Sequence, residues 1–158
     1  MYRAPYFSIT DYSIWAFEIL AELGIKIDSS VCPAKRFIGS VPAFAKGAPL
    51  IIETPSGSLK EFPINYSYLF GERIIYTGGG YFRFFPYQMI RYLMERSHYN
   101  MCYFHIRDFD KNQKRVHSLR YFKSYYGING AMKKFNEFLQ DFNFFSIGQA
   151  NDFCEWNK

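Results

Sequence analysis

Three side chains, far apart along the chain, carry groups suited to acid–base chemistry. Arg3 lies in the segment Arg3-Ala4-Pro5-Tyr6 near the end of an expected strand, where a guanidinium can hold a carboxylate through a bidentate pair. Asp28 ends a second expected strand, and its carboxylate could orient and charge a histidine. His105 ends a third, and imidazole titrates near neutral pH, which suits a general acid. These three are the candidate catalytic residues.

Each candidate also has a structural interpretation. Arg3 could be an ordinary basic residue near a mobile terminus. Asp28 could cap the loop that follows it, because Asp and Ser often bond to nearby backbone groups. His105 could be a hydrogen-bonded structural histidine. His98 and His117 lie in polar connections and are interpreted only in this structural way.

A glycine run precedes a second group of candidates. Gly78-Gly79-Gly80 lacks the Lys-Ser or Lys-Thr ending of a P-loop and the spacing of a dinucleotide-binding loop. Such a run lets the backbone approach a ligand or another chain segment closely. With Tyr81, Phe82 and Arg83 it could form the floor of a sugar groove, and the alternative is a tight turn.

Metal-ligand patterns do not occur in this sequence. The histidines show neither HxxxH nor HExxH spacing, and no two aspartates are adjacent. Cys32, Cys102 and Cys154 form no CxxC pair and are interpreted as buried, reduced thiols. We therefore predict no metal site within the chain.

Composition indicates one folded domain over residues 1–158. The 18.7 kDa chain is 49% hydrophobic and 21% charged, which excludes a disordered chain. No apolar run exceeds four residues and no apolar segment follows Met1, so we expect no transmembrane helix, no signal peptide and, for the chain as given, a cytoplasmic location. Aromatic residues make up 22%, which suits stacking on sugars or bases, or an aromatic core.

The positive charge is scattered along the chain. The net charge is +5, and Lys111, Lys114 and Arg115 form only a small cluster. Nucleic-acid binding proteins concentrate such charge on one face. We therefore expect no nucleic-acid partner.

The N-terminal third of the chain reads as a β-α-β unit. It comprises a strand over 2–9, a helix from about Asp11 that ends at Gly24, and a strand over 25–31. Such units form parallel sheets with right-handed crossovers. An insertion follows over about 32–77, and its short strands at 50–54, 59–64 and 73–76 predict a small antiparallel ribbon.

Helices are expected to dominate the second half. The pattern predicts a helix over 86–96, a strand over 100–106, and a helix over 130–142 whose buried stripe comprises Met132, Phe135, Leu139 and Phe142. The tail, 144–156, reads as a strand and a short helix.

Three of these segments, in order, resemble motifs of the polysaccharide deacetylases of the NodB-homology superfamily, carbohydrate esterase family four. Arg3-Ala4-Pro5-Tyr6 is similar to the third motif, Asp28-Ser29-Ser30 to the fourth, and Tyr103-Phe104-His105 to the fifth. A subgroup of the family, whose C-terminal half is a domain of unknown function, carries a similar Gly-Gly-Gly-Tyr-Phe-Arg run. It also carries His-Pro-Trp-Glu or His-Pro-Arg-Asp where this chain has His105-Ile106-Arg107-Asp108.

The resemblance implies a distorted β/α barrel that removes acetyl groups from the amino sugars of a cell-envelope or exopolysaccharide glycan. It implies that Arg3 pairs with the base carboxylate, that Tyr6 offers its backbone N–H to the oxyanion, and that His105 protonates the leaving amine. Asp28 would keep that histidine oriented and cationic. A divalent metal, usually zinc, would activate water in the complete family enzyme.

The chain departs from the family in lacking the first two motifs. These supply the base and the metal ligands, and they should precede Arg3. We therefore expect the C-terminal half of the barrel, inactive alone, which needs the missing N-terminal half or self-associates through open sheet edges. The alternative is a non-catalytic glycan-binding or scaffold domain that uses Tyr81 and Phe82 as stacking platforms.

Overall fold

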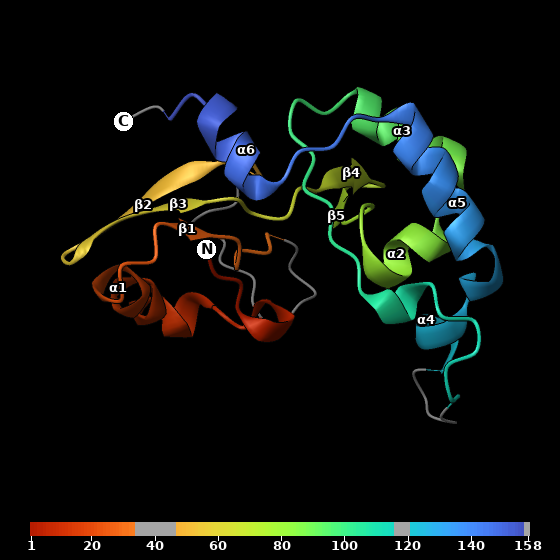
Figure 1. The fold of residues 1–158 in the computed structure, drawn as a ribbon, viewed down its shortest axis with the longest axis horizontal. Helices are drawn as coiled ribbons and strands as arrows, with labels where there is room; N and C mark the ends of the chain where they lie inside the picture. The colour runs from red at the N-terminus through yellow and green to blue at the C-terminus, as the bar shows by residue number, and fades with distance from the viewer. Residues whose placement is uncertain (34–46, 116–120, 157–158) are drawn as a thin grey trace. The chain divides into compact units, whose positions relative to one another are not determined.

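The computed structural model describes residues 1–33, 47–115 and 121–156 (Figure 1). The chain divides into two compact units. The first comprises Met1–Ile74 and Phe145–Lys158, and the second comprises Ile75–Phe144. The sequence-based prediction of a single domain over 1–158 stays a prediction.

A three-stranded sheet forms the centre of the first unit. Its strand order is β1 (Ile27–Asp28), β3 (Gly57–Glu61), β2 (Leu50–Thr54). The β1–β3 pair is parallel and the β2–β3 pair is an antiparallel hairpin, as predicted for the inserted ribbon. Tyr2 makes a further parallel bridge to Asp28, which brings the N-terminal segment beside β1.

Helices cover both faces of this sheet (Figure 1). Helix α1 (Trp15–Glu22) buries Phe17 and Leu20 against Leu59 of β3. Helix α6 (Ile147–Phe153) lies on the opposite face, where Lys60 Nζ donates to Asn151 Oδ1 at 2.9 Å. Residues 59 and 60 point to opposite faces because side chains alternate along a strand.

A second hairpin completes the first unit. It pairs β4 (Ser67–Leu69) with β5 (Glu72–Ile74) in antiparallel register. Both hairpins fall within the insertion expected over about 32–77, of which residues 34–46 lie outside the described part of the chain.

The second unit is helical. It contains α2 (Gly79–Phe84), α3 (Tyr87–Glu95), α4 (Tyr121–Tyr125) and α5 (Ile128–Asp141), with a 3₁₀ turn at Ile106–Asp108. Aromatic rings fill its core. Phe82 and Phe138 are both fully buried, with ring centroids 5.2 Å apart in an edge-to-face arrangement. The high aromatic content therefore serves, at least in part, to build this core.

Two predicted strands are wrong. The 2–9 segment leaves the sheet after Tyr2 and enters a 3₁₀ turn at Pro5–Phe7, because proline favours the first position of a helical turn. The 100–106 segment has no strand ladder in the described structure. Side chains hold it instead: Thr77 Oγ1 donates to the Met101 carbonyl at 2.8 Å, and Tyr76 Oη donates to Asn100 Oδ1 at 2.8 Å.

Other predictions need smaller corrections. Helix α5 buries Ile128, Ala131 and Phe138, whereas Met132 and Leu139 of the predicted stripe are about half exposed. The tail forms α6, and its described residues form no strand. Gly79 and Gly80 begin α2 rather than forming a tight turn.

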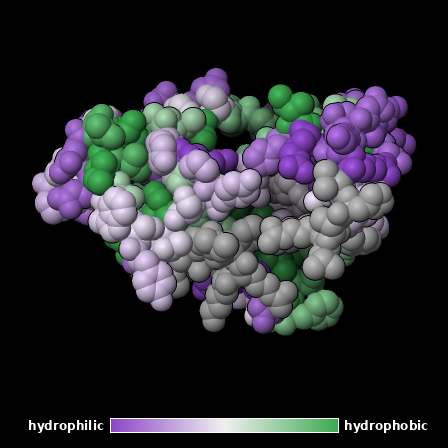
Figure 2. All heavy atoms as spheres, turned by 90° about the horizontal axis from the view of Figure 1, so that it is seen from below, coloured by the Kyte–Doolittle hydropathy of each residue, from purple (hydrophilic) through white to green (hydrophobic). Residues whose placement is uncertain are grey.

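The described residues thus form a mixed α/β structure with small sheets and no closed barrel. None of their helices has both the length and the apolar character needed to cross a membrane. Large apolar side chains nevertheless reach the surface. Trp15 at the start of α1 is 63% exposed, and Leu23 just after the end of this helix is 72% exposed. Figure 2 shows green, hydrophobic residues beside purple, hydrophilic residues on the face that it draws.

Candidate active site

Arg3 is held against the segment that follows β1. Its Nε donates to the Ser29 carbonyl at 3.0 Å, and its Nη2 donates to Ser29 Oγ at 2.7 Å. The neighbouring Ala4 N–H donates to Ser30 Oγ at 2.8 Å. The structure therefore brings the predicted Arg3–Tyr6 and Asp28–Ser30 segments together, and Arg3 is an anchored residue rather than a frayed one.

The backbone of the Arg3–Tyr6 turn is strained at its end. Tyr6 and Phe7 have φ angles of 56° and 52°, in the left-handed region that residues with a Cβ rarely adopt. Such residues cost on the order of 1–3 kcal/mol each and persist where the surroundings fix them. Here Phe7 is buried, while the Tyr6 side chain is 92% exposed. The turn therefore presents Tyr6 at the surface on a fixed backbone.

Asp28 is fully buried and caps the loop after it. Its Oδ2 accepts the Ser30 N–H at 3.0 Å, and its Oδ1 accepts the Ser30 hydroxyl at 2.9 Å. This confirms the local capping interpretation. The orienting role of Asp28 toward a histidine stays a prediction. Asp28 is also the register partner of the buried Glu61 in β3, and burial followed by contact with Asp28 raises the pKa of Glu61 well above its usual range.

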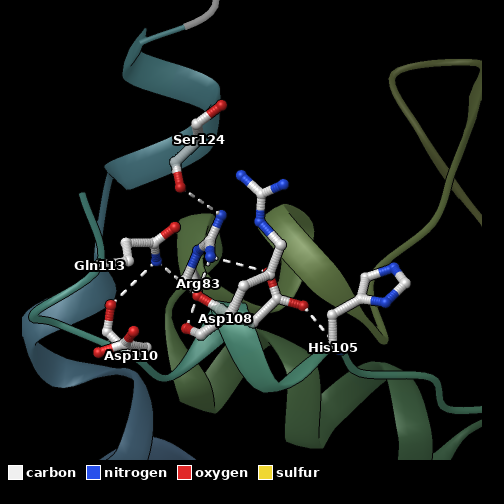
Figure 3. A network of polar contacts seen from close by, with 7 residues as sticks. Arg83, His105, Asp108, Asp110, Gln113 and Ser124 are labelled. Atoms are coloured by element: carbon white, nitrogen blue, oxygen red, sulfur yellow. Dashed lines mark hydrogen bonds and ion pairs between the residues drawn. The ribbon is translucent and has the colours of Figure 1, made fainter. Parts of the chain in front are cut away.

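His105 belongs to the second unit, whereas Arg3 and Asp28 belong to the first. Its side chain is exposed, with the imidazole 6.0 Å from the Tyr103 ring centroid in an edge-on arrangement. Its backbone N–H donates to Asp108 Oδ2 at 3.0 Å, and its ring points away from that carboxylate (Figure 3). The backbone of His105 is thus fixed while its imidazole is open to a ligand.

A buried ion pair supports the His105 turn. Arg83 Nη1 lies 2.8 Å from Asp108 Oδ1, and Arg83 Nη2 donates to the Ser124 carbonyl at 3.1 Å (Figure 3). The two side chains of the ion pair are 4% and 7% exposed. Burial lowers the pKa of Arg83, and a guanidinium remains charged despite such a shift. Arg83 therefore positions the turn and is too deeply buried to form the floor of a groove.

Gly78 allows the chain to pass close to the segment that leads to His105. A Cβ at Gly78 would lie 2.5 Å from the Tyr103 carbonyl oxygen, and φ at Gly78 is +124°. Only glycine meets both conditions without strain. This confirms the interpretation of the run as a place of close backbone approach, here to another chain segment.

The two aromatic candidates of the run differ in accessibility. Phe82 is fully buried among aromatic rings, so it has no face that a sugar could stack on. Tyr81 is half-buried and stacks on Phe85 with centroids 6.5 Å apart. Of the predicted substrate-binding residues, Tyr6 and Tyr81 are therefore the ones with accessible side chains.

Metal and thiol chemistry find little support in the described residues. No group of three or more His, Cys, Asp or Glu side chains among them could hold a metal ion, so these residues do not fit the zinc that the resemblance implies. The expectation of reduced thiols agrees with the structure, in which Cys32 is buried, whereas Cys102 and Cys154 are only partly buried. Burial raises the pKa of Cys102 to about 12, which keeps it unreactive. His117 lies outside the described residues.

Residues 29–152 match the family described as Domain of unknown function (DUF3473). The chain belongs to the DUF3473 family. The region matched to DUF3473 contains Glu61, Arg83, His105 and Asp108, whereas Arg3 and Asp28 precede it. No curated protein matches the chain. No solved structure matches it either.

Sequence reasoning missed the supporting residues of the site. In the sequence, Asp108 stands out only as part of a motif, and its proximity to Arg83, 25 residues away, has no local sequence signal. Glu61 does carry a signal: it shares a strand face with the apolar Leu59, and a charged residue at such a position is unusual.

Proposed function

We propose that this chain is the C-terminal part of a polysaccharide deacetylase, which hydrolyses acetyl groups on the amino sugars of a cell-envelope or exopolysaccharide glycan. The observation that carries the proposal is the exposed imidazole of His105 on a turn fixed by the buried Arg83–Asp108 pair. Membership of DUF3473 supports it, because this family is typically associated with C-terminal regions of polysaccharide deacetylases.

In the proposed reaction, His105 is the general acid that donates a proton to the leaving amine as the carbon–nitrogen bond breaks. Tyr6 offers its backbone N–H to the developing oxyanion. Arg3 pairs with the base carboxylate, and Asp28 orients His105. Each assignment follows from the motif that the residue matches.

The remaining parts of the proposed enzyme come from a separate segment. That segment supplies the base, the metal ligands and the strands that join β1 and β3 in a distorted β/α barrel. Zinc or another divalent metal bound there would activate water and polarise the acetyl carbonyl.

The test is acetate release from partially acetylated glucosamine polymers by the gene product made from its native locus. We expect His105→Ala to lower the rate by roughly 100- to 10,000-fold, the usual contribution of a general acid. His98→Ala is the matched control, because His98 is also exposed and should leave the rate unchanged. Circular dichroism would check that both variants fold.

Two outcomes would count against the proposal. A rate untouched by His105→Ala would remove the assigned acid. No acetate release by the intact gene product, together with retention on a glycan column without metal, would favour the non-catalytic glycan-binding alternative.

A further inference from the structure

Two buried carboxyl groups face each other across the β1–β3 pair. Asp28 and Glu61 are register partners, and both side chains are fully buried. Neither forms an ion pair with a lysine or arginine of the described residues. Two like charges so close in a dry site cannot both persist, so one carboxyl must hold a proton.

The hydrogen-bond donors around the pair identify which carboxyl holds it. Both oxygens of Asp28 accept bonds from Ser30, and Glu61 Oε1 accepts the Val31 N–H at 3.0 Å. Glu61 Oε2 receives no donor from any residue that the structure describes. Since both oxygens of Asp28 already accept bonds from Ser30, the oxygen of Glu61 that has no donor, Oε2, is the place for a proton. We propose that Glu61 is a positioning residue that stays protonated at neutral pH and donates from Oε2 to Asp28.

This proton completes a directional set of hydrogen bonds that reaches the Arg3–Tyr6 turn. Glu61 donates to Asp28, the Ser30 hydroxyl donates to Asp28 at 2.9 Å, and Ser30 Oγ in turn accepts the Ala4 N–H at 2.8 Å. If Glu61 ionised, repulsion would push Asp28 away from its partner and disturb Ser30. Glu61 therefore holds the backbone beside Arg3 in place through Asp28 and Ser30.

Among the charged groups around Glu61, Asp28 is the dominant partner. From β2, the register partner of Glu61 is the uncharged Leu50. Helix α1 packs on β3 through apolar side chains, and its Glu22 accepts a bond from Ser56 instead. The Arg3 guanidinium bonds to Ser29. Desolvation by burial, then the interaction with Asp28, raises the pKa of Glu61, which agrees with the assignment from geometry.

The proposal predicts a direction for the pH dependence of stability. A glutamate side chain in an unfolded chain has a pKa of about 4.5, and the pKa of Glu61 is higher in the folded chain. Between these two pH values the native state therefore holds one proton more than the unfolded state. Stability must therefore fall as pH rises through this window, by about tenfold in the folding equilibrium constant per pH unit. Glu61→Gln cannot ionise but can donate an N–H to Asp28, so this contribution should vanish.

The test uses the full chain and compares unfolding by urea across the acid-to-alkaline range. We expect the folding equilibrium constant of the wild-type protein, divided by the folding equilibrium constant of Glu61→Gln, to fall as the pH rises. Glu53→Gln, on the exposed side of the neighbouring strand, is the control and should keep the wild-type slope. An unchanged slope in Glu61→Gln would overturn the proposal.

Two further readouts do not rely on that variant alone. At neutral pH the wild-type infrared spectrum should contain the C=O band of a protonated carboxyl. This band should be lost in Glu61→Gln and kept in Glu53→Gln, and a wild-type spectrum with no such band refutes the assignment.

Hydrogen exchange tests the positioning role. Glu61→Leu should speed the exchange of the Ala4 amide by at least about tenfold. The exchange of the Gly24 amide, which donates to the Ala21 carbonyl at the end of α1, should not change. Equal effects on both amides would indicate general destabilisation and reject the positioning role. None of these measurements depends on deacetylase activity.

Discussion

Arg83 and Asp108 form a buried ion pair with 2.8 Å between Nη1 and Oδ1, while the other oxygen of the same carboxylate accepts the His105 N–H at 3.0 Å. One carboxylate thus joins α2 to the turn that carries the exposed imidazole. A bidentate use of Asp108 fixes this turn in two directions, because each oxygen has its own donor.

Replacing Arg83 should therefore be strongly destabilising. In Arg83→Met the Asp108 carboxylate would stay buried without its cation, and breaking a buried pair in this way costs about 3–5 kcal/mol. Urea unfolding would measure the loss. The control is Arg91→Met, whose partner Glu95 and own side chain are about half exposed, and which should cost no more than about 1 kcal/mol. Similar losses in the two variants would contradict a structural role for the Arg83–Asp108 pair.

Local sequence patterns correctly predicted the helices and strands whose ends are marked by neighbouring residues. The helix expected over 86–96 is α3, Tyr87–Glu95, because Pro86 marks its start and an apolar stripe follows. The strand expected over 50–54 is β2. The strand expected over 100–106 is wrong because an apolar run fixes no partner. Pairing depends on distant backbone groups, and here side chains from residues 76 and 77 satisfy the segment.

Sequence motifs single out Arg3, Asp28 and His105, but they do not reveal the residues that hold these three in place. Arg3 and the Asp28–Ser30 segment do meet, because the neighbouring Tyr2 bridges to Asp28 of β1. Arg83 was expected to contact substrate, and its pairing with Asp108 depends on the folding of a helix against a turn. Tertiary contacts of this kind have no periodic pattern, so the burial of Arg83 in an ion pair could not be predicted from the sequence.

The close approach at Gly78 predicts a large difference between two glycine substitutions. Gly78→Ala would place a Cβ 2.5 Å from the Tyr103 carbonyl at a φ of +124°, so the backbone leading to His105 must shift. We expect a loss of stability of about 1–3 kcal/mol. Gly130→Ala is the control, because its Cβ would meet nothing within 4 Å, and alanine in a helix is favoured by about 0.5–1 kcal/mol. Thermal unfolding would measure both, and a neutral Gly78→Ala would argue against the tight approach.

Lys134 caps the end of α2. Its ammonium donates to the carbonyls of Phe82, Arg83 and Phe85 at 3.0, 3.1 and 2.8 Å, which satisfies groups that a helix end leaves free. Lys134→Met keeps the aliphatic stem but removes these bonds, and the loss should be about 1.5–3 kcal/mol. Lys133→Met, on the exposed face of the same helix, should change stability by less than about 0.5 kcal/mol. Equal unfolding midpoints for the two variants would show that Lys134 is not a cap.

The position of the buried stripe of α5 can be tested at two adjacent residues. Phe138 is fully buried against Phe82, Phe142 and Phe144, whereas Leu139 is 48% exposed. Phe138→Ala should therefore cost about 3–5 kcal/mol, since it removes transfer free energy and leaves a cavity. Leu139→Ala should cost much less, because half of its side chain is already in water. Urea unfolding of both variants would decide between the two faces. A larger loss at Leu139 would restore the stripe expected from the sequence and place the aromatic cluster on the wrong side of the helix.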